Sequence, residues 1–203
     1  NVESGADIHA ATAAKIWHVP VEEVTPEQRK KAKQANFGII YGISTYGLAQ
    51  RMNISNSEAR QLIDDYFATF PRVKAYMDEA IATCREKGYA ETIYHRRRYL
   101  PDIASRNATV RGFAERNAIN APIQGSEADI IKVAMIHIFK RFAAEGLRSR
   151  MILQVHDELN FSVYPEEREQ VERIVIEEME NACRLSIPLT ADAGWGANWL
   201  EAH

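Results

Sequence analysis

The stretch ILQVHDELNFSV, residues 152–163, does most to decide how the chain folds. An apolar, β-branched run precedes His156, Asp157 and Glu158, and an alternating apolar run follows them. This pattern predicts two antiparallel strands joined by a tight hairpin turn. Such turns need positive φ, so histidine and aspartate cost backbone energy there. Two interpretations stay open: an ordinary turn, or a carboxylate held at a rigid tip where it binds a metal ion.

The composition is typical of a globular chain with enough apolar residues for a core. The chain has 203 residues, of which 46% are hydrophobic and 26% charged, and a formal net charge of −3. No apolar run approaches the ~20 residues of a membrane span, and the charged beginning predicts no signal peptide. The first residue is not Met, which is compatible with a piece of a longer protein. Cys84 and Cys183 lack metal-ligand spacing, which favours packing roles in a reducing compartment.

The charge is unevenly distributed along the chain. Residues 29–51 contain five basic residues and no acid, and residues 85–116 contain eight basic and four acidic residues. Residues 157–183 contain nine acids and two arginines. Solvated helix faces explain the acidic stretch, but the first basic stretch has no interleaved acids to make i,i+4 pairs. The basic stretches therefore indicate a localised anion-binding face.

Most of the chain is predicted to be helical. Thr25, Pro26 and Gln28 form a capping box with proline at the first helical position. We expect helices over 7–17, 25–41, 55–70, 71–87, 111–121, 126–145 and 165–184, a short hairpin within 89–101, and a final strand over 187–194. Helices followed by a hairpin packed by helices predict an α+β fold rather than a parallel βαβ sheet.

The predicted helix after Thr25 carries an unusual stripe. Arg29, Lys33, Phe37 and Tyr41 recur every four residues, which places them on one face of a helix. Core stripes are aliphatic, whereas cations leading to aromatic rings suit a phosphate tail attached to a ring system. A surface helix with solvated basic side chains is the alternative interpretation.

Five stretches carry a family resemblance in their order and spacing. They are GADIHAATA (5–13), RKKAKQANFGIIYG (29–42), RRRYLPDI (96–103), ERNAINAPIQGSEADII (115–131) and QVHDE (154–158). The second resembles the fingers-helix motif R-x3-K-x3-F-x3-Y-G of family A DNA polymerases, the bacterial DNA polymerase I group. The last resembles the second palm carboxylate motif of that family. One departure is His95, where the family usually has Gly before the arginines.

The resemblance implies a dNTP-binding site. Arg29 and Lys33 would contact the incoming triphosphate and serve catalysis, and His9 would assist at the phosphates. Phe37 would pack on the sugar and base, where Phe rather than Tyr implies discrimination against dideoxynucleotides. Tyr41 would guard the insertion site.

The resemblance also implies contacts to primer–template DNA and to metal. Residues expected to bind DNA are Gly42, Arg116, Asn120, Gln124 and His156. Asp157 would be the catalytic carboxylate that binds Mg²⁺, of which the intact parent enzyme would use two ions, and Glu158 would be a lesser neighbouring ligand.

The family's other metal-bridging aspartate lies in a D-Y-S-Q-I-E-L-R type strand upstream of DIH, and this sequence has no such segment. By resemblance, residues 1–18 form a palm-side entry helix, 19–110 the fingers subdomain, and 111–203 the C-terminal part of the palm. We therefore expect template-directed DNA synthesis by a two-Mg²⁺ mechanism in the parent protein, and no activity from residues 1–203 alone.

Two other functions stay open. A non-catalytic nucleic-acid-binding module would need only the basic face and the stacking aromatics, and an upstream D-x-S-x-x-E segment would favour the enzyme instead. A metal-dependent nuclease is disfavoured, because Asp157 and Glu158 are adjacent and neighbouring strand residues point to opposite faces. Partners would be dNTPs and primer–template DNA, with no membrane, and the protein would be a monomer in the bacterial cytoplasm, associated with the nucleoid.

Overall fold

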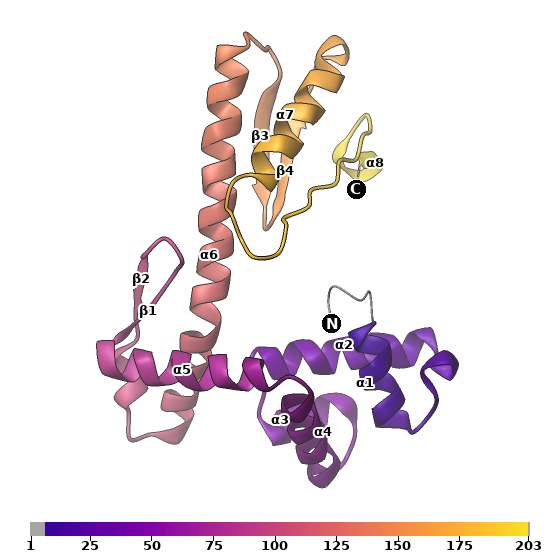
Figure 1. The fold of residues 1–203 in the computed structure, drawn as a ribbon, viewed down its shortest axis with the longest axis vertical. Helices are drawn as coiled ribbons and strands as arrows, with labels where there is room; N and C mark the ends of the chain where they lie inside the picture. Colours follow the sequence, from indigo (N-terminus) through magenta and orange to yellow (C-terminus); the bar gives the residue numbers. More distant parts are fainter. Residues whose placement is uncertain (1–6, 203) are drawn as a thin grey trace. The chain divides into compact units, whose positions relative to one another are not determined.

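The computed structural model describes residues 7–202 and has an α+β fold (Figure 1). The α-helices are α1 (Ile8–Trp17), α2 (Pro26–Ile40), α3 (Thr45–Met52), α4 (Asn56–Thr69), α5 (Pro71–Lys87), α6 (Ala108–Ala144), α7 (Arg168–Glu180) and α8 (Trp199–Ala202). The strands are β1 (Tyr89–Glu91), β2 (Arg97–Tyr99), β3 (Arg150–Val155) and β4 (Glu158–Ser162). Short 3-10 helices cover Val21–Glu23, Pro101–Ala104 and Pro165–Glu167.

The chain divides into two compact units. The first comprises the chain up to Ala90 together with Arg98–Asn120, and the second comprises Glu91–Arg97 and the chain from Ala121 onward. Each unit has its own core, so each is described by itself. The assignment of residues 1–18, 19–110 and 111–203 to palm-side, fingers and palm segments stays a prediction.

The core of the first unit joins α2, α3 and α4. Ile39 and Leu48 are buried, and Tyr66 packs its ring against Phe70 with the centroids 5.0 Å apart. Burial of each large apolar side chain contributes about 1.5–3 kcal/mol. The predicted Thr25 capping box is confirmed: Gln28 N lies 3.3 Å from Thr25 Oγ1, and Thr25 N lies 2.9 Å from Gln28 Oε1.

The core of the second unit joins α6, β4 and α7 (Figure 1). Ile138 of α6 and Ile174 of α7 are fully buried, and Phe142 packs against Phe161 of β4 with ring centroids 5.8 Å apart. The acidic stretch that begins at Asp157 therefore contains an apolar face, with its charges on the outside of α7. Part of the stretch is the expected solvated helix surface, but Glu177 and Glu178 form ion pairs with Arg141.

The predicted break at Pro122 is wrong, because α6 runs through it as a single helix of 37 residues. Proline removes one helical hydrogen bond and costs about 3 kcal/mol inside a helix. Burial on both sides offsets this cost: Ala118 and Ile119 are buried before Pro122, and Ala134 and Ile138 after it. The Ser126 hydroxyl also donates to the Pro122 carbonyl.

Three other predictions of secondary structure fail. Helices α3 and α8 were not expected, and α7 ends at Glu180, four residues earlier than expected. Residues 187–194 form no strand. Pro188 has no backbone N–H to donate to a ladder, and Ala191 N donates to the Glu180 side chain at 3.0 Å instead.

Candidate functional site

The α2 stripe, which we define as Arg29, Lys33, Phe37 and Tyr41, faces solvent. All four side chains are exposed, and 44% of Phe37 and 44% of Tyr41 are accessible. The buried residues of α2 are Ala32, Ala35, Asn36, Gly38 and Ile39. The aromatic rings therefore take no part in the core, which leaves them available to a ligand.

Contacts along the α2 stripe link its charges to its rings. Lys33 Nζ lies 5.7 Å from the centroid of the Phe37 ring, and the Phe37 and Tyr41 rings are stacked at 6.5 Å with an interplanar angle of 22°. Arg29 Nε lies 2.6 Å from Asp7 Oδ2. That guanidinium holds the pKa of the Asp7 carboxyl below its usual value. The stripe thus presents two cations next to a continuous aromatic surface.

His9 lies beside the α2 stripe on α1. Its ring centroid is 6.0 Å from that of Phe37, and its Nδ1 is 3.0 Å from Nδ2 of the buried Asn36. Thr12 Oγ1 lies 3.1 Å from Asn36 Oδ1, so the amide is fixed from its other side. Burial lowers the pKa of His9, and the neighbouring charge of Arg29 lowers it further. Burial and the charge of Arg29 thus both favour the neutral form of the imidazole.

Four of the predicted residues meet at the end of α2. Gly42 has φ +79°, and a Cβ atom there would lie 3.1 Å from Cγ of Arg116. Asn120 Nδ2 is 3.4 Å from the Tyr41 carbonyl oxygen. Asn120 Oδ1 is buried and has no hydrogen-bond partner within residues 7–202. The structure therefore brings Tyr41, Gly42, Arg116 and Asn120 together in the first unit.

Gln124, the remaining predicted residue of α6, belongs to the second unit and is exposed. It follows Asn120 by four residues on the same helix, as Asn120 follows Arg116. This spacing places the three side chains in one row along α6.

The predicted hairpin is confirmed: β3 and β4 are antiparallel, and Val155 pairs with Glu158. His156 and Asp157 alone form the turn, and His156 has φ +52°, the left-handed conformation that side chains other than glycine rarely adopt. Gln154 Nε2 donates to the His156 carbonyl oxygen at 2.6 Å. We call His156 and Asp157 the hairpin tip.

The two carboxylates of this hairpin have different surroundings. Asp157 is exposed, and its carboxylate makes no hydrogen bond or ion pair with the other residues that the structure describes. Glu158 Oε1 lies 2.9 Å from Asn160 Nδ2 and 2.6 Å from Trp199 Nε1. Asp157 is therefore the carboxylate that is available to a ligand, and Glu158 ties α8 to the hairpin.

The Asp157 carboxylate is a suitable ligand for a magnesium ion, but it is one ligand, and an Mg²⁺ site needs several. Mg²⁺ prefers carboxylate oxygen and commonly uses one or two carboxylates with phosphate oxygens and waters. Within residues 7–202, no group of three or more His, Cys, Asp or Glu side chains is arranged to hold a metal. Asp157 alone supplies one part of a site whose other ligands would come from elsewhere.

Many arginines of the second basic stretch are paired with acids. Arg96 Nε lies 2.8 Å from Asp129 Oδ1, Arg97 pairs with Glu91, and Arg85 pairs with Glu115. His95, where the family usually has glycine, adopts φ +63°, so the turn keeps the conformation that glycine favours. The free positive charge of this stretch is therefore smaller than its composition indicates.

Sequence reasoning missed Asn36 and Trp199. Asn36 gives one usable signal: asparagine is unfavourable inside a helix and is kept there only when its side chain has a specific partner. Trp199 gives none, because its hydrogen bond to Glu158 joins residues 41 positions apart.

Comparison with known proteins agrees with the sequence motifs. A sequence model described as DNA polymerase family A matches residues 1–201. DNA polymerase I of Geobacillus stearothermophilus is 54% identical over 198 residues, covering 98% of this chain and 23% of that protein. DNA polymerase I of Streptococcus pneumoniae serotype 4 is 50% identical over 201 residues, again covering 98% and 23%. The chain thus spans about a quarter of the length of these curated relatives.

A solved structure also resembles this chain. It is described as the POL domain of Pol1 from M. smegmatis in complex with DNA primer-template and dNTP. The TM-score is 0.90 at 47% identity, over 98% of this chain and 35% of that one. The chain belongs to DNA polymerase family A. In the part of the chain that the structure describes, none of the helices has the length and apolar character needed to cross a membrane.

Proposed function

We propose that this chain is part of a DNA polymerase that extends a primer by template-directed nucleotidyl transfer from dNTPs. The observation that carries the proposal is the solvent-facing α2 stripe, in which two cations lead into two stacked rings. Membership of DNA polymerase family A supports it, and so does the likeness to a polymerase domain whose structure includes DNA and dNTP.

Each residue of the α2 stripe has a chemical role in this proposal. Arg29 and Lys33 bind the triphosphate and stabilise the charge that builds on the leaving pyrophosphate, because phosphoryl transfer depends on positioning and electrostatics. His9, neutral and bound to Asn36, donates from Nε2 to a phosphate oxygen. Phe37 packs on the sugar and base of the incoming nucleotide, and Tyr41 closes the insertion site.

The remaining predicted residues hold DNA and metal. Arg116, Asn120 and Gln124 follow the primer–template along one row of α6, with Gly42 giving the template strand room to approach. His156 lies near the primer terminus. Asp157 holds the metal with its free carboxylate, and Mg²⁺, when bound, supplies charge stabilisation for the attacking 3′-hydroxyl and the leaving pyrophosphate.

A second candidate function is a non-catalytic nucleic-acid-binding module. It is favoured by one observation: Asp157 is the only carboxylate of the hairpin that is free, in a part of the chain that contains no three-residue metal cluster. Under either function we place the protein in the bacterial cytoplasm, acting as a monomer on the DNA of the nucleoid.

The experiment that separates the two functions uses the protein of residues 1–203 and the complete polymerase side by side. We expect primer extension with Mg²⁺ and four dNTPs from the complete enzyme and none from residues 1–203. The reason is that one carboxylate does not fix two ions, and alignment contributes about 7–11 kcal/mol to such reactions. Extension by residues 1–203 would contradict the need for a second carboxylate. A complete protein that binds DNA without extending it would favour the binding module.

DNA binding by residues 1–203 is measured in the same samples by fluorescence anisotropy at two salt concentrations. We expect weak binding whose affinity falls steeply with added salt, because cations on the protein displace counterions from the phosphates. Affinity that is independent of salt would contradict the role of the basic face.

A further inference from the structure

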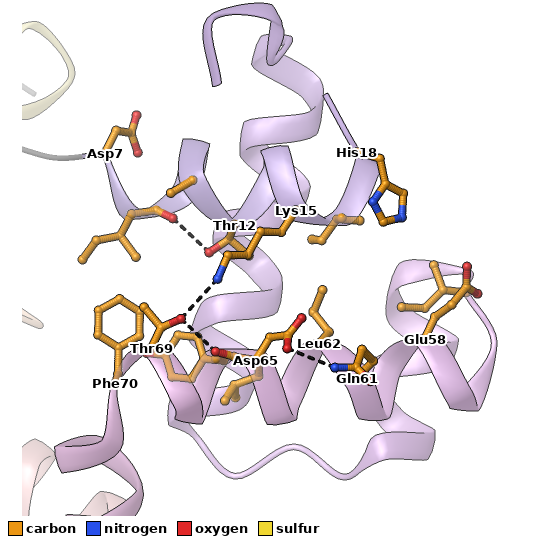
Figure 2. A pocket seen from close by; sticks show the side chains of 16 residues that line it. Asp7, Thr12, Lys15, His18, Glu58, Gln61, Leu62, Asp65, Thr69 and Phe70 are labelled. Atoms are coloured by element: carbon orange, nitrogen blue, oxygen red, sulfur yellow. Dashed lines mark hydrogen bonds between the residues drawn. The ribbon is translucent and has the colours of Figure 1, made fainter. Parts of the chain in front are cut away.

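A half-open pocket of about 250 Å³ lies between α1 and α4 in the first unit. Its floor is apolar and includes Ile8, Ile16, Ile39, Leu62 and Phe70. Figure 2 shows polar side chains of α1 and α4 around its rim, with Lys15 reaching across toward Thr69. Concave sites with an apolar lining and a few polar groups are the usual form of small-molecule sites, and this one is slightly smaller than their usual volume of about 300–1,000 Å³.

The rim carries charges of both signs, which sets the kind of ligand that fits. Lys15 Nζ lies 3.2 Å from Thr69 Oγ1 and makes no ion pair with a carboxylate of residues 7–202. Asp65 Oδ1 lies 3.0 Å from Gln61 Nε2 and likewise has no cationic partner there. A charged ligand would be attracted by one of these groups and repelled by the other, so the rim favours an uncharged one.

The other carboxylates of the rim are already engaged. Asp7 pairs with Arg29 at 2.6 Å, and Glu58 Oε2 lies 2.8 Å from Ser55 N and 2.7 Å from Ser55 Oγ. The charge of Asp7 is thereby balanced, whereas Glu58 keeps its negative charge, and His18, which also lines the pocket, is near enough to help lower the pKa of Glu58. Lys15 has three N–H donors and bonds Thr69 with one of them, so it can also donate to a hydrogen-bond acceptor on a ligand.

The pocket is joined to His9 by a short chain of contacts. Thr12 lines the pocket, and its Oγ1 lies 3.1 Å from Oδ1 of Asn36, whose Nδ2 lies 3.0 Å from Nδ1 of His9. Thr12 is thus one contact away from the amide that holds His9. Asp7 gives a second link, because it lines the pocket and pairs with Arg29.

From these observations we infer that the α1–α4 pocket is a binding site for small, uncharged molecules of the size of one or two aromatic rings with a single hydrogen-bond acceptor, and that occupancy is transmitted to His9 through Thr12 and Asn36. The site is separate from the exposed α2 stripe, since its lining comes from α1, α4 and the buried face of α2.

The test uses 1-naphthol as the probe, with 1-naphthoate and 1-naphthylmethylammonium as anionic and cationic analogues of the same ring system. Calorimetry on the 203-residue protein should give one site for 1-naphthol with a Kd on the order of 0.1–1 mM, as expected for a ligand of this size. Each charged analogue should bind at least tenfold more weakly. A charged analogue that binds as tightly would overturn the charge argument.

Two variants locate the site. Ala11→Trp places a large ring in the pocket and should abolish binding, whereas Ala68→Trp, at another exposed alanine on α4 that does not line the pocket, should leave it unchanged. Lys15→Met, which keeps the apolar stem and removes the ammonium, should weaken binding at least fivefold. Equal binding by wild type, Ala11→Trp and Lys15→Met, or no binding by wild type, would overturn the site.

Heteronuclear NMR then tests the link to His9. Addition of 1-naphthol should shift the backbone amides of Lys15 and Leu62 and also the side-chain amide of Asn36. If the first two move and the Asn36 signals stay in place, the site stands and the link to His9 is refuted.

Discussion

Asn36 Nδ2 lies 3.0 Å from His9 Nδ1, so the buried amide and the imidazole are hydrogen-bonded to each other. Because Nδ1 is bound to Asn36, Nε2 is the ring nitrogen of His9 that is left to contact a ligand beside Arg29 and Lys33. Asn36 is itself 2% exposed and is held by Thr12 from the other side. One buried amide thus fixes the orientation of the imidazole that lies beside the α2 stripe.

The first prediction concerns the pKa of His9. Burial lowers it, and Arg29 is the next cause, so Arg29→Gln should raise the His9 pKa toward about 6.5, the ordinary value for histidine. NMR titration of the imidazole C–H signals measures it. Lys30→Gln removes an exposed charge of the same helix that is not among the causes of the shift, and should leave the titration unchanged. A larger change for Lys30→Gln would contradict the assignment.

The same shift predicts how stability depends on pH. Because the pKa of His9 is lower in the folded state than in the unfolded state, the unfolded chain binds the extra proton first. The stabilisation is present above about pH 6.5 and is lost as the pH falls toward the folded-state pKa. Urea denaturation at several pH values should show this loss in wild type and a smaller one in His9→Gln. Identical pH profiles would show that His9 titrates normally.

Lys33→Ala in the complete polymerase should raise the KM for dNTPs and lower kcat. It removes one charge-assisted contact to the triphosphate, worth roughly 1.5–3 kcal/mol, or about ten- to over a hundredfold in rate. Lys30→Ala, next to the stripe but outside it, is the matched control in steady-state kinetics. An effect of less than twofold for Lys33→Ala would refute its role.

Phe37→Tyr in the complete polymerase should increase incorporation of dideoxynucleotides. The family resemblance places this ring against the sugar, and 44% of it is accessible for that contact. Chain-termination assays compare the ratio of dideoxy- to deoxynucleotide incorporation in wild type and variant. An unchanged ratio would contradict the position of Phe37 at the sugar.

Gly42→Ala should destabilise the protein by more than Gly88→Ala. Both glycines have φ +79°, so both substitutions carry the cost of the left-handed conformation, about 1–2 kcal/mol. At Gly88 an added Cβ meets nothing within 4 Å, whereas at Gly42 it comes within 3.1 Å of Arg116 Cγ. The difference between the two free energies of unfolding measures that contact alone. Equal losses would show that Arg116 moves aside freely.

Local signals in the sequence were enough to predict most elements. The capping box at Thr25 and the hairpin around Asp157 depend on residues within a few positions of each other, and both are confirmed. The break at Pro122 failed because burial of distant apolar residues of α6 outweighs the local cost of proline. The missed α3 shows the same limit, since Leu48 is buried only by its contacts with other helices.

The candidate site was predictable where it is periodic. The α2 stripe follows from a spacing of four residues, and its exposure agrees with that reasoning. The network behind it was not predictable, because Asn36 meets His9 across 27 positions and Thr12 across 24. Whether Glu158 binds metal stays a prediction, and its bond to Trp199 is a tertiary contact without a local pattern.

The two faces of α2 also bear on how the sequence can evolve. Packing constrains Ala32, Ala35 and Ile39, which are buried, whereas under the proposed function the ligand constrains Lys33 and Phe37. Selection for folding and selection for activity should therefore act on different residue positions of the same 15-residue helix. In a library of α2 variants, losses on one face should show as poor expression and losses on the other as intact but inactive protein, and only a few positions such as Lys30 and Gln34 are left to drift.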